Sequence, residues 1–377
     1  MKPSAHQRAE RGLAELTSLP TATGHEDRVV AWVERWAKRR RSVTIKRDRY
    51  GNLMLKRVGV SSRRPIVFTA HLDHPAFVVT ACDGDRVTAE FRGGVRDKYF
   101  VGTAVRLHRD GIDRPGPRGV VETLRPAEGR SFKTVGVRFV SAVDAQPGDI
   151  LTWDLGAAKI KGDRLHAPAC DDLAAAAAMF AAFGELLKLR RTSKRDVPDV
   201  RLLCTRAEEV GFIGAIGACK SGLIPKGARL IALENSKSFA ESPIGGGPIV
   251  RVGDRTSTFD PALTYQVGQV AQALAGRDAD FRWQRKLMTG GTCEASAFQA
   301  LGYTATCVCL PLGNYHNMNE DHGRIEPEVI ALSDYHGLVR LLVEVGKSLD
   351  DPATTVPFKA VLDRLFDDRR SLLAPKK

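Results

Sequence analysis

The sequence contains no apolar run close to the ~20 residues that a membrane-spanning helix requires. The longest candidate runs from Leu173 to Phe183 and is followed directly by Gly184 and Glu185, so we interpret it as a buried helix. The N-terminal segment is charged and lacks an apolar stretch that leads to a small-residue cleavage site, which argues against a secretion signal. We therefore expect a cytoplasmic protein that does not bind membranes.

Cysteine is scarce, and its spacing suggests no pairing. There are seven cysteines, an odd number, and no two of them have the CxxC spacing. This pattern argues for a reducing compartment in which most cysteines are small buried hydrophobic residues. Cys307 and Cys309 lie in a strand pattern, and we assign both to the core.

The sequence also lacks a basic stripe interleaved with aromatic residues, although its net charge is +13. The Lys and Arg residues are scattered over short runs at 37–42, 61–65 and 188–196 and in the C-terminal segment. Such runs usually form solvated surfaces. Without a zinc-finger spacing or an RNA-binding signature, we expect no nucleic-acid partner.

Hydrophobic residues make up 43% of the chain, enough for one large domain or two ordinary ones. Residues 13–40 carry apolar side chains at helical spacing with a break at 20–24, which predicts two amphipathic helices. Residues 42–58 predict a hairpin with its turn at 50–52.

Short apolar runs that end in polar clusters recur along the chain and predict buried strands. They cover residues 64–75, 199–209, 228–236 and 304–317. Helical patterns separate them at 171–189, about 210–220 and 295–301. This alternation predicts an α/β fold with a mostly parallel central sheet flanked by helices.

Residues 76–165 break the alternation with closely spaced strand patterns and turns rich in Gly, Pro and Asp. No helical pattern lies among them, so we predict a small inserted β-barrel or sandwich, and of the two we favour the barrel. The expected organisation is one α/β domain formed by 1–75 and 166–377 and interrupted by a β domain at 76–165.

Side chains that can bind metals stand at the carboxyl ends of four predicted strands, where α/β sheets build their sites. They are His71 with Asp73, Glu208 with Glu209, Glu234, and His316. Another acid, Asp171, begins the alanine-rich helix. Singly, these residues are explained as helix caps, solvated helix starts or loop residues.

Together these residues suggest a metal centre, because clustered carboxylates without cations would repel one another and raise their own pKa values. Two divalent ions that share one carboxylate, each with one further carboxylate and one histidine, need two histidines and three acids. The pattern supplies that set and leaves one glutamate over, which is free to act as a base.

These residues resemble a known family, the dinuclear metalloaminopeptidases of the tetrahedral, glutamyl-aminopeptidase type, some of which were once named endoglucanases. The resembling motifs follow one another along nearly the whole chain. They are "LPTATGHEDRVVAWV", "YGNLMLK", "TAHLDHPAF", "QPGDILTWD", "PACDDLAAA", "RAEEVGFIGA", "GGGPIV", "GGTCEASAFQALGY" and "NYHN".

The resemblance implies that five residues are metal ligands. It makes Asp171 the carboxylate that two ions share. His71 and Glu234 would complete the ligands of one ion, and Glu209 and His316 those of the other. Two divalent metal ions per chain are implied, and zinc is favoured over cobalt or manganese for this mixture of histidine and carboxylate.

The resemblance also assigns two catalytic acids. Asp73 would hold the second ring nitrogen of the first histidine ligand and fix its tautomer. Glu208 would be the general base that takes a proton from water and passes it to the leaving amine. The peptide bond between Asp171 and Asp172 is expected to be cis in such sites.

Three positions depart from the family pattern. His74 replaces a common glutamate, and we expect it to support the site or lie in a loop. Glu234 stands where aspartate is usual. Cys293 also replaces an aspartate, in a segment that the resemblance makes substrate-binding together with Gly291 and Thr292.

The predicted function is that of an aminopeptidase acting on peptide substrates. A related carboxypeptidase, dipeptidase or deacylase stays open because of the longer Glu234, and so does a non-enzymatic scaffold on the same fold. The resemblance further implies a homo-oligomer, from a dimer up to a tetrahedral dodecamer.

Overall fold

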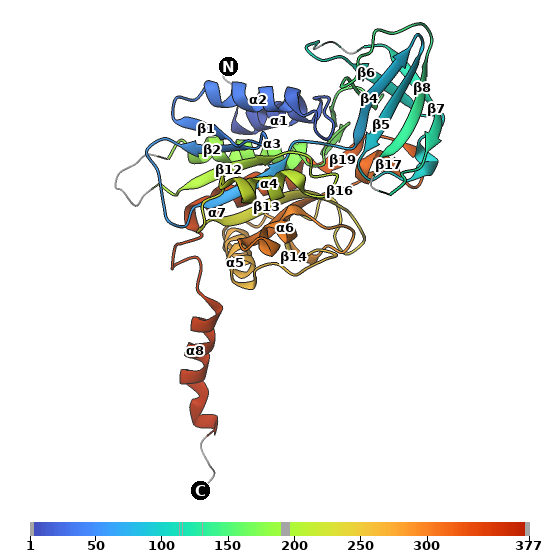
Figure 1. Ribbon diagram of the computed structural model, residues 1–377. Coiled ribbons are helices and arrows are strands. Elements are labelled where there is room, and N and C mark those ends of the chain that lie inside the picture. Colours follow the sequence, from blue (N-terminus) through green and yellow to red (C-terminus); the bar gives the residue numbers. More distant parts are fainter. Residues whose placement is uncertain (1–3, 113, 115, 130, 190–196, 374–377) are drawn as a thin grey trace.

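An eight-stranded sheet forms the centre of the computed structural model, which describes residues 4–373 except 113, 115, 130 and 190–196 (Figure 1). The strand order is β1-β2-β12-β3-β13-β16-β14-β15. These strands are β1 (Val43–Arg47), β2 (Leu53–Arg57), β3 (Ile66–His71), β12 (Val200–Thr205), β13 (Arg229–Lys237), β14 (Ile249–Gly253), β15 (Gln284–Leu287) and β16 (Thr304–Leu312). The four central strands β12, β3, β13 and β16 run parallel, whereas β2 and β14 join them antiparallel. The predicted α/β class with a mostly parallel sheet is confirmed.

Helices cover both faces of the sheet because its central strands are apolar on both sides. On β12, Leu202 and Cys204 pack toward one layer of helices and Leu203 packs toward the other. The first layer holds α1 (Ala5–Thr17), α2 (Asp27–Lys38), α3 (Leu173–Leu186), α5 (Pro261–Arg277) and α7 (Leu332–Ser348). The second layer holds α4 (Ile213–Ser221) and α6 (Glu294–Ala300).

Six strands between β3 and α3 close into an antiparallel barrel in the order β4-β5-β8-β7-β6-β9. They are β4 (Ala76–Asp83), β5 (Arg86–Arg92), β6 (Ala104–His108), β7 (Arg118–Arg125), β8 (Lys133–Phe139) and β9 (Ile150–Trp153). Aromatic rings fill the interior; the ring centroids of Phe77 and Trp153, for example, lie 4.7 Å apart. The predicted inserted barrel is confirmed.

One predicted barrel segment lies elsewhere. Residues 159–167 form a hairpin of β10 (Lys159–Lys161) and β11 (Arg164–Ala167), and β11 pairs with β19 (Glu328–Ala331) in a separate three-stranded sheet. The reason is burial: Leu165 and Ala167 pack into the core of the α/β domain, not into the barrel.

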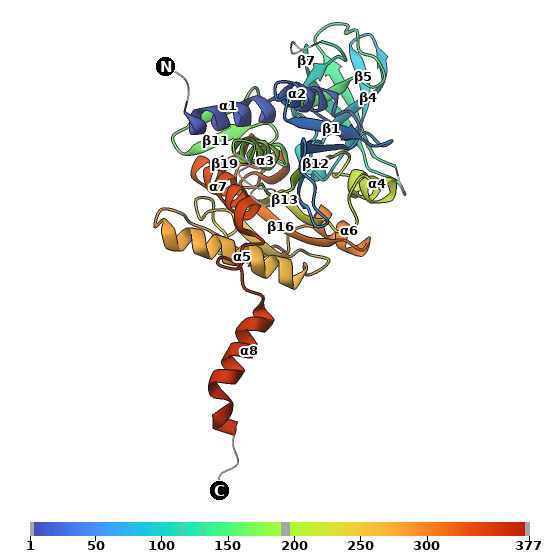
Figure 2. The ribbon, with the colours of Figure 1, turned by 90° about the vertical axis from the view of Figure 1, so that its left-hand side faces the viewer.

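The last helix, α8 (Phe358–Arg369), extends away from the rest of the molecule (Figures 1 and 2). The remaining short elements are η1 (Asp97–Tyr99), η2 (Tyr315–Asn317), β17 (Met318–Asn319), β18 (Arg324–Ile325) and η3 (Arg370–Leu373). Over the part of the chain that the structure describes, no helix has the length and apolar character needed to cross a membrane.

Candidate metal centre

The five predicted ligands meet at the carboxyl edge of the parallel sheet. β3 ends at His71, β13 carries Glu234, and His316 lies just beyond β16. Glu209 follows β12, and Asp171 precedes α3. All four strands run parallel, so their ends bring groups that are far apart in sequence to one place.

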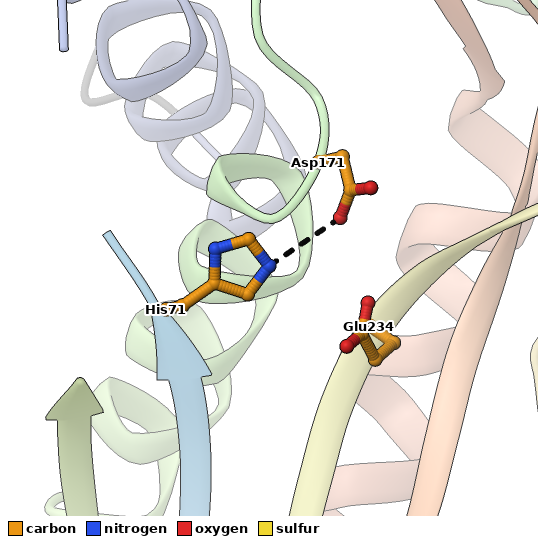
Figure 3. Close-up of side chains that lie close together, drawn as sticks. All are labelled: His71, Asp171 and Glu234. Carbon is orange, nitrogen blue, oxygen red and sulfur yellow. Dashed lines mark ion pairs between the residues drawn. The ribbon is translucent and has the colours of Figure 1, made fainter. Parts of the chain in front are cut away.

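The first group of possible ligands comprises His71, Asp171 and Glu234, each of which offers an atom within 4.8 Å of the others. Nε2 of His71 lies 3.5 Å from Oδ1 of Asp171. Figure 3 shows the imidazole and the two carboxylates converging from β3, the loop before α3, and β13. One divalent ion would lie between them.

The second group comprises Asp171, Glu209 and His316, again with ligand atoms within 4.8 Å of one another. Nε2 of His316 lies 3.5 Å from Oδ2 of Asp171 and 3.4 Å from Oε2 of Glu209. The two oxygens of Asp171 therefore face different histidines, as a carboxylate shared by two ions requires. The peptide bond between Asp171 and Asp172 is cis.

Electrostatics at the site follow from burying acids and histidines together. Burial raises the pKa of Glu209 to about 7, although His316 opposes that shift. Burial alone would lower the pKa of His316, but Glu209 and Asp171 outweigh it and raise this pKa to about 9. Burial, reinforced by Asp171, raises the pKa of Glu234 well above its usual range. Protons thus take the place of cations in the metal-free protein.

A further observation indicates that these residues fit a pair of divalent cations. Oδ1 of Asp171 and Oε1 of Glu209 are buried and have no hydrogen-bond partner among the described residues. Buried carboxylate oxygens are costly to leave unpaired, and cations would satisfy them. A set of imidazole nitrogens and carboxylate oxygens suits zinc.

Glu208 lies beside the two groups that share Asp171 and belongs to neither of them. Its Oε2 lies 4.0 Å from Nε2 of His71, and the two residues form a further close group with Glu209. Burial raises the pKa of Glu208 well above its usual range. A carboxylate so placed can exchange a proton with a water held between the ligands.

Asp73 ties the end of β3 to the turn that carries the two glutamates. Its carboxylate accepts hydrogen bonds from the backbone N–H groups of Glu208 (3.0 Å) and Glu209 (3.1 Å) and from the hydroxyl of Thr23 (2.8 Å). Nδ1 of His71 lies 3.4 Å from Oδ1 of Asp73. Asp73 thereby positions a histidine, the predicted base and a further ligand at once.

The barrel orients the other histidine. Nδ1 of His316 donates a hydrogen bond of 2.7 Å to the backbone oxygen of Gly94, which follows β5. This bond places the proton on Nδ1 and leaves Nε2 free to bind a cation. Tyr315 stacks on the same ring with centroids 3.8 Å apart.

A glycine lets the start of α4 approach the turn that bears the glutamates. A Cβ at Gly214 would lie 2.1 Å from the backbone oxygen of Arg206 and 2.8 Å from Oδ1 of Asn52. Any larger residue would have to push this backbone away. Gly214 therefore permits the close contact in which its backbone N–H donates to the backbone oxygen of Arg206 (2.8 Å).

Glu328 on β19 is a supporting residue that the sequence analysis missed. Its Oε2 accepts hydrogen bonds from the backbone N–H groups of Cys170 (2.6 Å) and Asp171 (3.0 Å). Its Oε1 accepts a hydrogen bond from the backbone N–H group of His316 (2.8 Å). A single buried carboxylate thus joins the two backbone segments that carry the shared ligand and a histidine ligand. In the sequence it looks like one polar residue in a short strand.

Replacing Glu328 by Gln should weaken metal binding by about 10- to 100-fold, the usual effect of losing a group that orients ligands. An amide NH₂ would face backbone N–H donors where a carboxylate oxygen now accepts. Competition with a chelator measures the affinity. Glu326→Gln is the matched control, because the hydrogen bonds described for the Glu326 side chain join Asn319, His322 and Arg324 and none of the proposed ligands. Equal affinities for Glu328→Gln and the unchanged chain would contradict this role.

His74, which departs from the family pattern, supports the site without joining either group. Its Nδ1 lies 2.6 Å from the backbone oxygen of Asp171, and its Nε2 lies 3.0 Å from Oδ1 of Asn317. Asn317 also donates to the backbone oxygen of Pro168 (3.0 Å). These bonds hold the segment before α3 against the segment after β16.

The predicted substrate-binding residues lie beside the cluster in the loop before α6. Cys293 is 1% exposed and packs in the core under α6, so its thiol does not face solvent. Gly291 and Thr292 are half-buried, and a Cβ at Gly291 would lie 4.0 Å from the hydroxyl of Tyr315. Their place near a site residue keeps them candidates for substrate contact.

Residues 51–324 match a family described as M42 glutamyl aminopeptidase. That range contains all five predicted ligands and the predicted base. The chain belongs to the M42 glutamyl aminopeptidase family. The membership agrees with the resemblance of the sequence motifs.

Solved structures with the same fold include several aminopeptidases. An aminopeptidase of the archaeon Desulfurococcus kamchatkensis is 21% identical with a TM-score of 0.74, over 92% of this chain and 96% of that one. The TET1 peptidase of Pyrococcus horikoshii, which can assemble into a tetrahedron or a large octahedral shell, is 20% identical with a TM-score of 0.72, over 90% and 99%. A protein of Thermotoga maritima called an endoglucanase is 18% identical with a TM-score of 0.64, over 89% and 96%. At these identities the likeness shows the fold.

A short match relates this M42 chain to another peptidase. The cytosol non-specific dipeptidase of Escherichia coli is 32% identical over 63 residues, which is 16% of this chain and 13% of that protein. The chain therefore spans only a small part of that dipeptidase.

Proposed function

We propose that this M42 chain is a metal-dependent aminopeptidase that removes N-terminal residues from peptides. One observation carries the proposal: two groups of possible ligands share Asp171, and Glu208 lies beside both of them. Peptide hydrolysis needs an activated water, a site for the carbonyl oxygen and a proton carrier, and this cluster can supply all three.

The chain's own residues would hold two divalent ions, with zinc favoured over cobalt or manganese. His71 and Glu234 would hold one ion, Glu209 and His316 would hold the other, and Asp171 would contribute to both. When bound, such ions lower the pKa of water and polarise the peptide carbonyl. A positive charge nearby would also lower the raised pKa of an adjacent carboxyl group.

Glu208 then acts as the general base. Its carboxylate takes a proton from the attacking water and returns it to the leaving amine as the peptide bond breaks. Asp73 keeps the backbone of Glu208 and the ring of His71 in place through the contacts described above. Gly291 and Thr292 are proposed to border the space for the substrate, whereas Cys293 is buried in the core.

Activity toward a free N-terminus tests the proposal. Protein loaded with zinc should hydrolyse aminoacyl arylamides and unblocked peptides at least ~100-fold faster than the same peptides with an acylated N-terminus, because acylation delocalises the nitrogen lone pair and leaves a nitrogen that is no longer basic. Preference for the blocked peptides, or release of C-terminal residues, would favour a deacylase or a carboxypeptidase. Cleavage of dipeptides alone would favour a dipeptidase, the alternative that the short match to the Escherichia coli protein supports.

Metal binding should depend on pH, because the metal-free site holds protons. His316, with its pKa raised to about 9, and Glu209, with its pKa raised to about 7, must both lose protons before they bind a cation. Raised pKa values mean that apparent affinity falls as pH drops, by up to about tenfold per pH unit for each displaced proton. Between pH 7 and 9 His316 contributes such a proton, and below pH 7 Glu209 adds another.

Calorimetry of zinc binding in two buffers with different ionisation heats counts the protons released. We expect at least one at pH 8 and more at pH 6. Zinc binding that releases no proton at either pH would contradict this description of the metal-free site.

We also propose a homo-oligomer in the cytoplasm. The TET1 peptidase of Pyrococcus horikoshii can assemble into a tetrahedron or a large octahedral shell, and a further solved TET1 structure is described as a dodecamer in the asymmetric unit, which supports assembly here. Sedimentation of the purified chain tests this part separately from activity.

A further inference from the structure

Helix α8 extends away from the rest of the molecule (Figures 1 and 2). Its apolar residues are exposed. Within the described residues, none of its side chains is buried. Apolar residues recur along it at the spacing of one helical face: Phe358, Val361, Leu362, Leu365 and Phe366. Leu372 and Leu373 continue the apolar surface in η3. We call these seven residues the α8 stripe.

The size of the α8 stripe points to a binding surface. Its side chains are between 38% and 80% exposed. Together they expose roughly 800 Å² of apolar surface, the area that one partner gives to an interface of standard size. Monomers seldom leave contiguous apolar patches larger than a few hundred Å².

The base of α8 is fixed, so the helix projects in a defined direction. Thr355 is buried and donates to the backbone oxygen of Leu349 (2.9 Å). The backbone N–H of Val356 donates to Oε1 of Gln269 on α5 (3.2 Å), and the ring of Phe358 contacts Tyr265 with centroids 5.4 Å apart.

A groove on the body offers a matching apolar surface. It lies between α1, α2, α3 and α7 and has a volume of about 1040 Å³. Its lining includes the apolar residues Trp32, Trp36, Phe180, Val339 and Val343. Arginines such as Arg35, Arg39 and Arg340 border it.

We propose that the α8 stripe of one copy of the chain lies in this groove of a second copy. A helix of 12 residues is ~18 Å long, and its apolar side chains have the bulk to fill a hollow of this volume. α8 carries three aspartates and three basic residues, so it is neutral overall and a basic rim does not repel it. Lys359 is already paired with Asp363 (2.6 Å).

A second copy suits the stripe better than a lipid surface does. Helices that lie on membranes carry mainly Lys and Arg on their polar side. The charged residues of α8 are instead balanced, with Asp363, Asp367 and Asp368 against three basic residues. Exchange between two copies would be reciprocal, which buries both stripes and both grooves around one twofold axis.

Charged substitutions in the stripe test the proposal. Leu362→Asp with Leu365→Asp should weaken self-association by at least ~100-fold, measured by sedimentation over a range of concentrations. The matched control, Ala360→Asp with Arg364→Asp, places acids on the polar side and should leave association unchanged. Since α8 buries no described side chain, circular dichroism should show both variants folded. Association of the stripe variant as tight as that of the control would overturn the proposal.

Cross-linking identifies the surface that receives the stripe. One tagged chain carries Leu365→Cys, a second chain with a different tag carries Val343→Cys, and both are co-expressed and treated with a flexible bismaleimide. We expect a mixed dimer that neither single variant gives alone. Each single variant also contains the half-buried Cys82 and Cys219, so it reveals any cross-link that these two cysteines form. Two results would overturn the proposal: a dimer of Leu365→Cys with itself in place of the mixed dimer, or no link at all.

Discussion

Glu208→Gln is expected to lower kcat by about 10³-fold, within the range that general acid–base catalysis usually contributes. Gln has nearly the shape of Glu but cannot accept the proton of the attacking water. The backbone N–H of Glu208 would still bind Asp73, so the turn should keep its position. Rates with an aminoacyl arylamide and metal content by mass spectrometry measure the two effects separately.

Metal content distinguishes a lost base from a lost site. The Glu208→Gln variant should hold as much zinc as the unchanged chain. Glu209→Gln is the matched control, because it removes a proposed ligand from the neighbouring position and should lower the affinity of one ion. A Glu208→Gln variant within tenfold of the original rate would show that another group carries the proton.

Asp171→Ala should have a still larger effect, with loss of both ions and of all measurable hydrolysis. The two oxygens of Asp171 lie 3.5 Å from Nε2 of His71 and 3.5 Å from Nε2 of His316, so no other described residue serves both groups. Without the shared carboxylate each ion would keep one histidine and one acid, fewer than the three protein ligands of a typical catalytic zinc site.

The comparison with Glu234→Ala makes this prediction specific. Glu234 belongs to one group only, so its loss should lower zinc content from about two ions to about one. Asp171→Ala should lower it below one. If Asp171→Ala retained close to two ions, the proposed sharing of its carboxylate would be wrong.

The sequence predicted the sheet and the cluster because both follow from local patterns. Apolar runs that end in charged groups mark the strands, and parallel strands bring their ends to one edge. This is why His71 and Glu234 could be grouped although 163 positions, the difference of their numbers, separate them. The start of α1 was missed because its first turns are polar. A capping box between Ser4 and Gln7 begins the helix there, before the first apolar residue of the predicted pattern at Leu13.

Long-range pairing explains the larger differences. The hairpin at 159–167 was assigned to the barrel because its strands and turns look like those before it. Its partner β19 lies about 160 residues later, and a single sequence gives no sign of that pairing. Glu328, on the same strand, escaped notice for the same reason. The sequence analysis made no prediction for α8; its apolar residues recur at helical spacing, and spacing alone does not show whether such a face is buried or exposed.

The hydrogen bond from His316 to the backbone oxygen of Gly94 gives the barrel a share in the chemistry. A shortened protein that joined residue 75 directly to residue 154 would keep every proposed ligand and the base. It would lose the acceptor that holds the imidazole proton on Nδ1, and the ring could then turn its protonated nitrogen toward the cation. The inserted domain therefore contributes to metal binding by orienting His316. A shortened version of this enzyme must retain the loop after β5.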